Sequence, residues 1–142
     1  MINSRPVIRL MSLAHAFAYR LTAGRLGGNV GNAPVLVLTT IGRRSGLPRS
    51  TPVLYLRDGE RFVLVASNAG DDKDPLWWSN LKENPKATVR VGTTDNKVIA
   101  RQASPEEKTR YWPQLVALYP TYSSYQKKTQ REIPLVVLTP SE

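Results

Sequence analysis

The spacing of hydrophobic residues changes near residue 34, and this change divides the chain into two parts. Upstream, apolar residues recur at the spacing of one helix face, with Arg5, Arg9 and Arg20 on the opposite side. That apolar face comprises Val7, Leu10, Met11, Ala14, Phe17, Ala18 and Leu21. The glycines that end the helix are Gly24, Gly27, Gly28 and Gly31. We therefore expect an amphipathic helix with a glycine-rich connection over residues 1–33, and one domain over residues 34–142.

Two interpretations of the N-terminal helix stay open. In the more common one, the helix packs its apolar face on the domain. In the other, it lies on a membrane surface or covers the entrance to a ligand site.

From residue 34 onward the pattern is that of short strands joined by tight turns. The expected strands are Val35–Thr40, Pro52–Arg57, Phe62–Ser67, Ala87–Val91, Val98–Ala103 and Ile133–Leu138. The first is apolar enough to be buried on both faces. Asp58-Gly59 is a strong hairpin signal, and a polar turn is expected at Thr93–Asn96. Because most connections have hairpin length, we expect a largely antiparallel sheet closed into a small barrel.

Two segments rich in proline mark helices around this barrel. Asp74 as N-cap and Pro75 at the first helical position start a short helix that runs to about Lys82 and stops at Asn84-Pro85. A capping box at Ser104-Pro105-Glu106-Glu107 opens the other.

The second of these helices contains Pro113, which predicts a kink or a restart at that residue. With these elements the predicted class is α+β, mainly β. It is a small, largely antiparallel barrel with an N-terminal helix and short peripheral helices.

The composition restricts the chemistry that the side chains can supply. The chain has no cysteine, which excludes disulfides, thiolate nucleophiles, zinc ribbons and iron–sulfur clusters. Its only histidine, His15, cannot form a multi-histidine metal site, and no catalytic motif surrounds it. We therefore expect a bound cofactor to supply any chemistry.

The net charge of +9 lies almost entirely in the first part of the chain. Eight arginines precede Asp58, the first acidic residue, whereas the rest of the chain is nearly neutral. This asymmetry indicates an anionic partner, which could be nucleic acid, phospholipid or a polyanionic small molecule. We find no apolar run of transmembrane length and no signal peptide, so the expected location is the cytoplasm.

Two loops could form a binding site. Gly42-Arg43-Arg44-Ser45-Gly46 follows the first strand, and its guanidinium and backbone N–H groups could converge on one anion. Ser67-Asn68-Ala69-Gly70 ends the third strand with small residues that let a flat ring approach the backbone. Taken alone, each segment is more commonly an ordinary surface loop.

Two aromatic clusters could line the same site. Trp77 and Trp78 are adjacent on a helix and cannot face the same way, so one could pack in the core and the other flank an aromatic cofactor. Packing of both in the core is equally compatible with the spacing. Tyr119, Tyr122 and Tyr125 share one face if helical, where their hydroxyls could orient a carbonyl or quinone oxygen and supply a proton. Half-buried packing also explains such a stripe.

Taken together and in this order, the segments resemble the deazaflavin-dependent nitroreductase family of actinobacteria and mycobacteria. The resemblance covers roughly residues 33–140, from LTTIGRRSGLPRSTPVLYL through KDPLWWSNL and YWPQLVALYPTYSSYQ to REIPLVVLTP. It implies a split β-barrel of the kind that also binds FMN, and it implies coenzyme F-420 as the cofactor. The anionic tail of that coenzyme would be the partner of the early positive charge.

The resemblance also implies residues for each part of the site. For the coenzyme they are Arg43, Arg44, Ser45, Gly46, Leu47, Pro48, Arg49, Pro52, Ala66, Ser67, Asn68, Ala69, Lys73, Leu76, Trp77, Trp78, Asn80 and Tyr122. The implied catalytic residues are Tyr119, Tyr122, Tyr125 and Ser67. No metal is implied.

The implied reaction is hydride transfer from the reduced deazaflavin to a quinone, an activated alkene or a nitroaromatic compound. A proton would follow from Tyr122, from solvent or from the coenzyme. Two positions depart from the family pattern: Asn68 stands where a relative has Lys, and Leu54 stands where the nitroimidazole-reducing member has Tyr. The loss of that hydroxyl puts nitroimidazole reduction in doubt but leaves quinone and enone reduction untouched.

Three alternatives remain at this point. A split barrel could bind FMN, whose single phosphate needs fewer cations than Arg43 and Arg44 provide. A basic barrel with exposed aromatics could bind single-stranded nucleic acid, although here the charge and the aromatics do not alternate along a groove. The protein could also carry the coenzyme without turnover. A monomer or a homodimer, and peripheral contact of the N-terminal helix with the membrane, are all compatible with the sequence.

Overall fold

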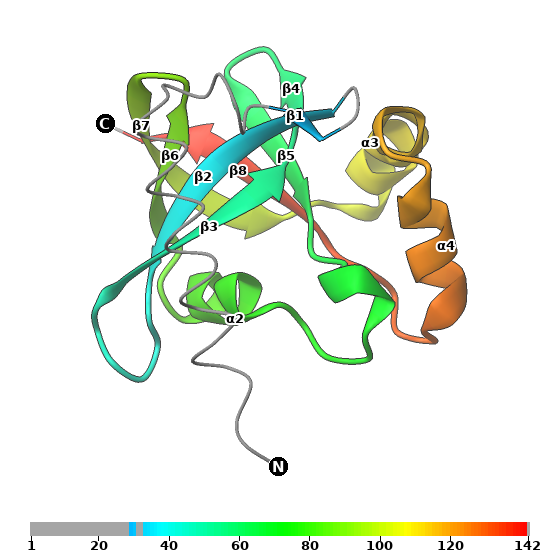
Figure 1. Cartoon of the computed structure of the whole chain (residues 1–142), viewed down its shortest axis with the longest axis horizontal. Helices are drawn as coiled ribbons and strands as arrows, with labels where there is room; N and C mark the ends of the chain where they lie inside the picture. The colour runs from blue at the N-terminus through cyan, green and yellow to red at the C-terminus, as the bar shows by residue number, and fades with distance from the viewer. Residues whose placement is uncertain (1–28, 31–32, 142) are drawn as a thin grey trace.

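The fold is an antiparallel barrel with three short α-helices and a 3-10 turn packed around it (Figure 1). A computed structural model describes residues 29–30 and 33–141, so the predicted N-terminal helix lies outside the described residues. The strands are β1 (Asn29–Val30), β2 (Ala33–Ile41), β3 (Pro48–Leu54), β4 (Leu56–Asp58), β5 (Arg61–Val65), β6 (Lys86–Val91), β7 (Thr94–Gln102) and β8 (Leu135–Pro140). The helices are η1 (Asn68–Gly70), α2 (Leu76–Glu83), α3 (Pro105–Leu118) and α4 (Thr121–Lys128).

All strand pairs of the described sheet are antiparallel, as the hairpin-length connections predict. The strands follow the order β1-β2-β6-β7-β8-β5-β4, and β3 pairs with β2. The predicted hairpin at Asp58-Gly59 is confirmed: β4 pairs with β5, and Gly59 takes the left-handed φ of +59° that this turn needs.

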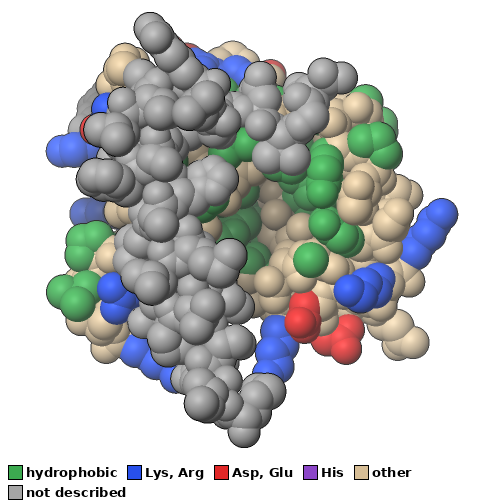
Figure 2. All heavy atoms as spheres, in the orientation of Figure 1, with side chains coloured by type: hydrophobic (Ala, Val, Ile, Leu, Met, Phe, Trp, Pro, Cys, Tyr) green, Lys and Arg blue, Asp and Glu red, His purple; other side chains and the backbone are tan. Residues whose placement is uncertain are grey.

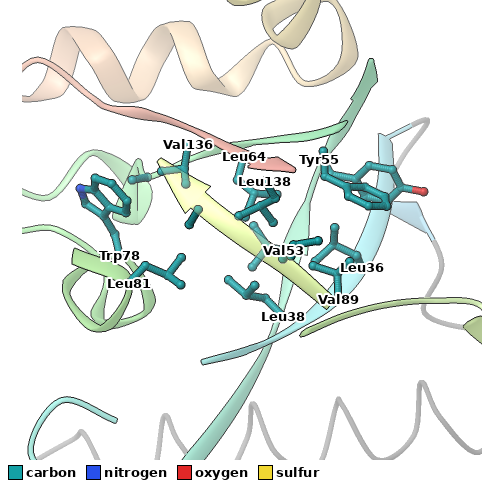
Figure 3. Close-up of a cluster of buried hydrophobic side chains, with 14 residues drawn as sticks. Leu36, Leu38, Val53, Tyr55, Leu64, Trp78, Leu81, Val89, Val136 and Leu138 are labelled. Carbon is teal, nitrogen blue, oxygen red and sulfur yellow. The ribbon is translucent and has the colours of Figure 1, made fainter. Parts of the chain in front are cut away.

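The interior of the barrel is one hydrophobic cluster to which six strands contribute (Figure 3). Its strand members include Leu36, Leu38, Val53, Leu64, Val89, Val98, Val136 and Leu138. Trp78 and Leu81 of α2 extend this cluster, so α2 covers one end of the barrel. A common interior shared by strands that are distant in sequence is what closes a sheet into a barrel.

A second cluster lies on the outer side of β5 and β8, where α3 and α4 pack. Along β5 the side chains alternate, with Phe62 and Leu64 in the inner cluster and Val63 and Val65 in the outer one. Both faces of this strand are therefore covered, which explains its continuous apolar sequence. The outer cluster includes Tyr122, so the barrel wall fixes the position of α4 directly.

The start of α2 differs from the prediction by one residue. Pro75 is the N-cap, and no side chain caps the helix. The Asp74 carboxylate instead forms ion pairs with Lys82 at 2.8 Å and Arg131 at 3.2 Å. Asp74 therefore acts as a tertiary link and not as a helix cap, while Asn84 ends the helix as expected.

Helix α3 begins as predicted but does not break at its proline. The Ser104 hydroxyl accepts a hydrogen bond from the Glu107 N–H, and the Glu107 carboxylate accepts one from the Ser104 N–H. The helix then runs through Pro113 to Leu118, so the predicted restart at Pro113 is wrong. Pro113 is exposed, and solvent can satisfy the carbonyl that loses its partner. The restart comes at Pro120, which precedes α4.

Removal of the Ser104 cap is expected to destabilise the fold modestly. A Ser104→Ala variant leaves the Glu107 N–H without its side-chain acceptor, which costs about 1 kcal/mol at a helix N-terminus. Urea unfolding followed by far-UV circular dichroism measures the change, with Ser124→Ala, an exposed position within α4, as the control. A loss equal to that of the control would show that the cap contributes nothing.

Several predicted strand boundaries also need correction, among them the end of the third strand, which is Val65 and not Ser67. The second predicted strand begins earlier, at Pro48, and is interrupted at Tyr55, whose N–H donates to the Pro34 carbonyl. The turn between β6 and β7 is tighter than Thr93–Asn96, because Gly92 takes a left-handed φ of +59° and β7 starts at Thr94. The last strand starts at Leu135. In each case the hydrogen bonds with the neighbouring strand set the boundary, and a pattern of hydrophobic residues does not predict them.

Candidate active site

A deep pocket opens between the β2–β3 hairpin, α2, the loop before it and α4. Its volume is about 840 Å³. Figure 2 shows the hollow near the centre of one face, with hydrophobic side chains inside it and Lys and Arg side chains along the lower left. The pocket therefore joins a cationic end to an apolar and aromatic interior.

The cationic end is the turn between β2 and β3. Arg43, Arg44 and Arg49 line it. Two hydrogen bonds of 2.8 Å close the turn: the Gly42 N–H donates to the Leu47 carbonyl, and the Gly46 N–H donates to the Gly42 carbonyl. A side chain at Gly42 would place its Cβ 2.6 Å from the Ser45 Oγ, so Ser45 would have to rotate away from the hydrogen bonds that it accepts from Leu47 and Arg49.

Asn80 holds this basic turn against α2. Its side chain is buried; its Oδ1 accepts hydrogen bonds from the Arg43 N–H at 3.2 Å and the Arg43 guanidinium at 3.4 Å, and its Nδ2 donates to the Thr40 Oγ1 at 3.1 Å. Arg44 makes no hydrogen bond or ion pair with another residue of the described ranges. Arg43 is thus oriented by protein, while Arg44 remains available for an anion.

The loop that follows β5 forms the next wall. Asn68, Ala69 and Gly70 all have left-handed backbones, with φ of +47°, +55° and +80°. Two consecutive non-glycine residues in this region are uncommon and indicate that the surrounding contacts impose the conformation. Ser67 is buried at the base of the loop, and Ala69 presents only a methyl group, so a flat group can approach this wall closely.

The two adjacent tryptophans separate, as one of the two interpretations required. Trp78 is buried in the barrel cluster, and Trp77 is half-buried and lines the pocket. Two adjacent residues, one at the end of β3 and one just after it, also face opposite ways. Leu54 lines the pocket, whereas Tyr55 is buried and packs edge-on against Phe62, with ring centroids 5.5 Å apart.

Tyr119, Tyr122 and Tyr125 form a further wall, where Tyr119 caps the end of α3 and the other two belong to α4. Their ring centroids lie 5.0 to 6.4 Å apart in edge-on and tilted geometries. Burial raises the pKa of Tyr122, and the neighbouring phenols of Tyr119 and Tyr125 raise it further. A hydrogen bond with Tyr119 raises the pKa of Tyr125, with a smaller effect from burial. Tyr122 therefore stays a neutral hydrogen-bond donor at physiological pH.

The structure brings most of the residues singled out from the sequence to this pocket. Those that line it are Arg43, Arg44, Ser45, Arg49, Pro52, Ser67, Asn68, Ala69, Lys73, Leu76, Trp77, Asn80, Tyr119, Tyr122 and Tyr125. Five do not: Gly46, Leu47, Pro48, Ala66 and Trp78. Gly46 supplies the left-handed corner of the basic turn, Leu47 is exposed beside it, and Ala66 and Trp78 belong to the barrel core.

Gly42, which opens the predicted basic loop, also lines the pocket. Sequence reasoning missed other lining residues, namely Thr40, Ser50, Thr51, Val53, Val65, Asp71, Asp74 and Pro75. Thr39 and Ser50 face each other on the β2–β3 hairpin, with their hydroxyls 2.8 Å apart. The register of that hairpin identifies Ser50 and Thr51, which precede the predicted strand Pro52–Arg57. Within the described ranges no group of three or more His, Asp or Glu side chains is placed to hold a metal, and no helix is long and apolar enough to cross a membrane.

Comparison with known proteins agrees with this geometry. A family model described as "F420H(2)-dependent quinone reductase" matches residues 11–140. The chain is 39% identical over 137 residues to the F420H(2)-dependent quinone reductase Rv1261c of Mycobacterium tuberculosis, covering 93% of this chain and 91% of that one.

Two solved structures share the fold at more than 30% identity. One is an F420-H2 dependent reductase named FDR-A, with 35% identity, a TM-score of 0.69, and coverage of 79% of this chain and 99% of that one. The other is described as a domain-swapped dimer, with 33% identity, a TM-score of 0.71, and coverage of 89% and 96%. These matches confirm the predicted split barrel. The match over nearly the whole length establishes that the chain belongs to the F420H(2)-dependent quinone reductase family.

Proposed function

We propose that this protein transfers a hydride from reduced coenzyme F-420 to a quinone. The family points to this reaction. The observation that carries it is a single pocket with an arginine-lined end, a wall of small residues and a wall of tyrosines. This arrangement suits a ligand that has an anionic tail and a flat ring, with a second flat molecule beside the ring.

The residues present fit that coenzyme. Arg44 is uncommitted and Arg43 is held in place by Asn80, so the basic turn can receive phosphate and carboxylate groups. Asp71 and Asp74 also line the pocket, but Asp74 is neutralised by Lys82 and Arg131. The deazaflavin ring would lie against Ser67, Ala69 and Trp77. When bound, the coenzyme supplies the hydride.

The protein supplies orientation and exclusion of water. Pro52, Leu54, Val65 and Trp77 give the pocket an apolar interior in which a quinone can displace water. The neutral Tyr122 hydroxyl can donate a hydrogen bond to a quinone oxygen and stabilise the negative charge that develops there. Because the pKa of Tyr122 is raised, we assign it this donor role, with solvent or a neighbouring tyrosine completing proton delivery.

Leu54 favours quinones and enones over nitroimidazoles within this proposal. Its side chain adds apolar surface to the pocket at a position where no hydroxyl is available for a nitro group. A homodimer is the assembly we propose to test first, because one related structure is described as a domain-swapped dimer. Size-exclusion chromatography with light scattering determines the assembly, and flotation with anionic vesicles tests contact with membranes.

The first experiment is a fluorescence titration of the purified protein with coenzyme F-420, beside FMN at the same salt concentration. Micromolar or tighter binding of the deazaflavin with weak FMN binding supports the proposal, and reduction of menadione by the reduced coenzyme then tests turnover. Tight FMN binding without deazaflavin binding would contradict it. Binding without turnover of any quinone would indicate a carrier.

The basic turn gives this titration a sharper form. In an Arg44→Ala variant the dissociation constant of the coenzyme should rise about tenfold, because one charge-assisted contact of the tail is lost. The rise should shrink as salt is added. Lys97→Ala is the matched control, since it removes one positive charge from an exposed position on β7 outside the pocket. Equal effects of the two substitutions would show that only net charge attracts the coenzyme.

A further inference from the structure

We propose that Arg131, which does not line the pocket, is the positioning residue that holds the wall formed by residues 66–75. This inference rests on the proposed function, because its consequence is the correct placement of the coenzyme ring. Arg131 lies between α4 and β8, and no sequence motif marks it as a site residue. Its side chain is 17% exposed, which is low for an arginine.

The guanidinium of Arg131 reaches the beginning, the middle and the end of this wall. Its Nη2 donates to the Ala66 carbonyl at 3.2 Å and the Ser67 carbonyl at 3.0 Å, and its Nε donates to the Asp71 carbonyl at 3.1 Å. Its Nη1 donates to the Asp74 carboxylate at 3.2 Å. One planar group thus fixes four residues that surround the left-handed turn of Asn68–Gly70.

The backbone of Arg131 is itself anchored to α4. Its N–H donates to the Thr129 Oγ1 at 3.2 Å, and its carbonyl accepts from the Gln126 side chain at 2.9 Å. The Thr129 hydroxyl also donates to the Asp72 carboxylate at 2.7 Å. The arginine therefore connects the helix that carries Tyr122 and Tyr125 to the wall that adjoins it, residues 66–75.

The Asp74 contact extends this connection to α2. The same carboxylate pairs with Lys82 at 2.8 Å, and α2 carries Trp77 together with Asn80, the residue that holds the basic turn. Arg131 consequently forms hydrogen bonds with the wall of residues 66–75 and with the segment after α4. Through Asp74 it is also connected to α2, the helix that holds the basic turn. A lysine cannot take this place, because an ammonium group lacks the fixed fork that reaches four acceptors.

The conformation that Arg131 holds is one the chain would not keep unaided. Asn68 and Ala69 adopt left-handed backbones, which L-residues other than glycine rarely keep without support from neighbouring contacts. Loss of the three hydrogen bonds from Arg131 to backbone carbonyls frees the wall to relax toward ordinary backbone geometry. The pocket wall should then open more often, whereas the barrel should keep its stability.

The test uses Arg131→Lys, Arg131→Ala and a control, Arg101→Ala. Arg101 makes a bidentate pair with Glu107 on the surface of β7 and lies outside the pocket. Hydrogen exchange of the protein without coenzyme, followed by mass spectrometry, is the first measurement. Both Arg131 variants should exchange the Gly70 and Asp71 amides at least about tenfold faster while β2, β6 and β7 remain unchanged, because opening is local. Arg101→Ala should leave that segment as in wild type.

Coenzyme binding and turnover follow, at a temperature where all variants are folded. Turnover in Arg131→Lys should fall by about a hundredfold, since a displacement of about 1 Å in a site can cost that much. The affinity for the coenzyme should fall with it, and the KM for the quinone should change little.

Five outcomes decide between the possibilities. Unchanged exchange of residues 66–75 in Arg131→Lys overturns the proposal, and so does wild-type coenzyme affinity in that variant. Full rescue by lysine would show that only the charge matters, which also contradicts it. If the wild-type protein does not bind the coenzyme, the proposed function fails, and the exchange measurement still decides whether Arg131 holds the wall. If Arg131→Ala does not fold, the lysine variant carries the test.

Discussion

A Tyr122→Phe variant should bind coenzyme F-420 as the wild type does and reduce quinones about a hundredfold more slowly, the usual cost of removing one hydrogen-bond donor from a developing oxyanion. The phenol is buried and belongs to the tyrosine wall, so the substitution removes one hydroxyl without leaving a cavity. Stopped-flow measurement of coenzyme oxidation separates the hydride-transfer step from binding. An unchanged rate would remove Tyr122 from the reaction.

The control for this variant is Tyr55→Phe, the same substitution in a buried tyrosine that packs in the barrel interior and does not line the pocket. Its rate should equal that of wild type. Tyr125→Phe should have a smaller effect than Tyr122→Phe, because Tyr125 is less buried and lies farther along α4. A larger loss in Tyr125→Phe would place the substrate oxygen nearer to that residue.

The raised pKa of Tyr122 gives the same variant a signature in stability. The folded state favours the neutral phenol, whereas in the unfolded chain a tyrosine ionises near its ordinary pKa of about 10. This contribution to the free energy of unfolding is fully present below about pH 10 and is lost as the pH rises further. The unfolding free energy of wild type should therefore decrease above that pH, and Tyr122→Phe should decrease less steeply. Parallel curves in urea titrations would contradict the direction of the shift.

Much of the barrel could be predicted from sequence because the conformation that the local sequence favours is also the one that the folded barrel requires. Asp58-Gly59 marks a turn whose left-handed glycine the structure confirms, and the Ser104 capping box forms as its sequence requires. Predictions failed where a distant partner decides the outcome. Asp74 has the sequence of an N-cap but pairs with Lys82 and with Arg131, which lies far along the chain.

The site shows the same division. The basic turn and the tyrosines are local patterns, so sequence could identify them as candidates, although only the resemblance to a family joined them into one site. Arg131 begins the segment REIPLVVLTP that contributes to the resemblance, but that segment gives the residue no role. Its acceptors are mostly backbone carbonyls more than fifty positions upstream, so only the folded structure shows what it holds.

Gly70 should be harder to replace, in terms of stability, than Gly46 or Gly59, which also have left-handed backbones. Alanine there takes the strained φ of +80° and places its Cβ 2.9 Å from the Tyr125 carbonyl oxygen and 3.1 Å from the Tyr125 Cα. The backbone strain costs about 1 to 2 kcal/mol, and overpacking against backbone adds about 1 to 3 kcal/mol. We expect Gly70→Ala to lower the free energy of unfolding by about 3 kcal/mol in urea titrations.

Gly59→Ala is the matched control, because Gly59 has a similar left-handed φ of +59° but nothing within 4 Å of the added Cβ. It should cost about 1 kcal/mol, the backbone strain alone. The difference between the two variants measures how firmly α4 is held against the loop. If Gly70→Ala is no more destabilising than Gly59→Ala, α4 moves away, and the displaced Tyr122 should then lower turnover even though stability is preserved. A destabilised variant with normal turnover of its folded fraction would instead show that the loop yields and the tyrosine wall stays in place.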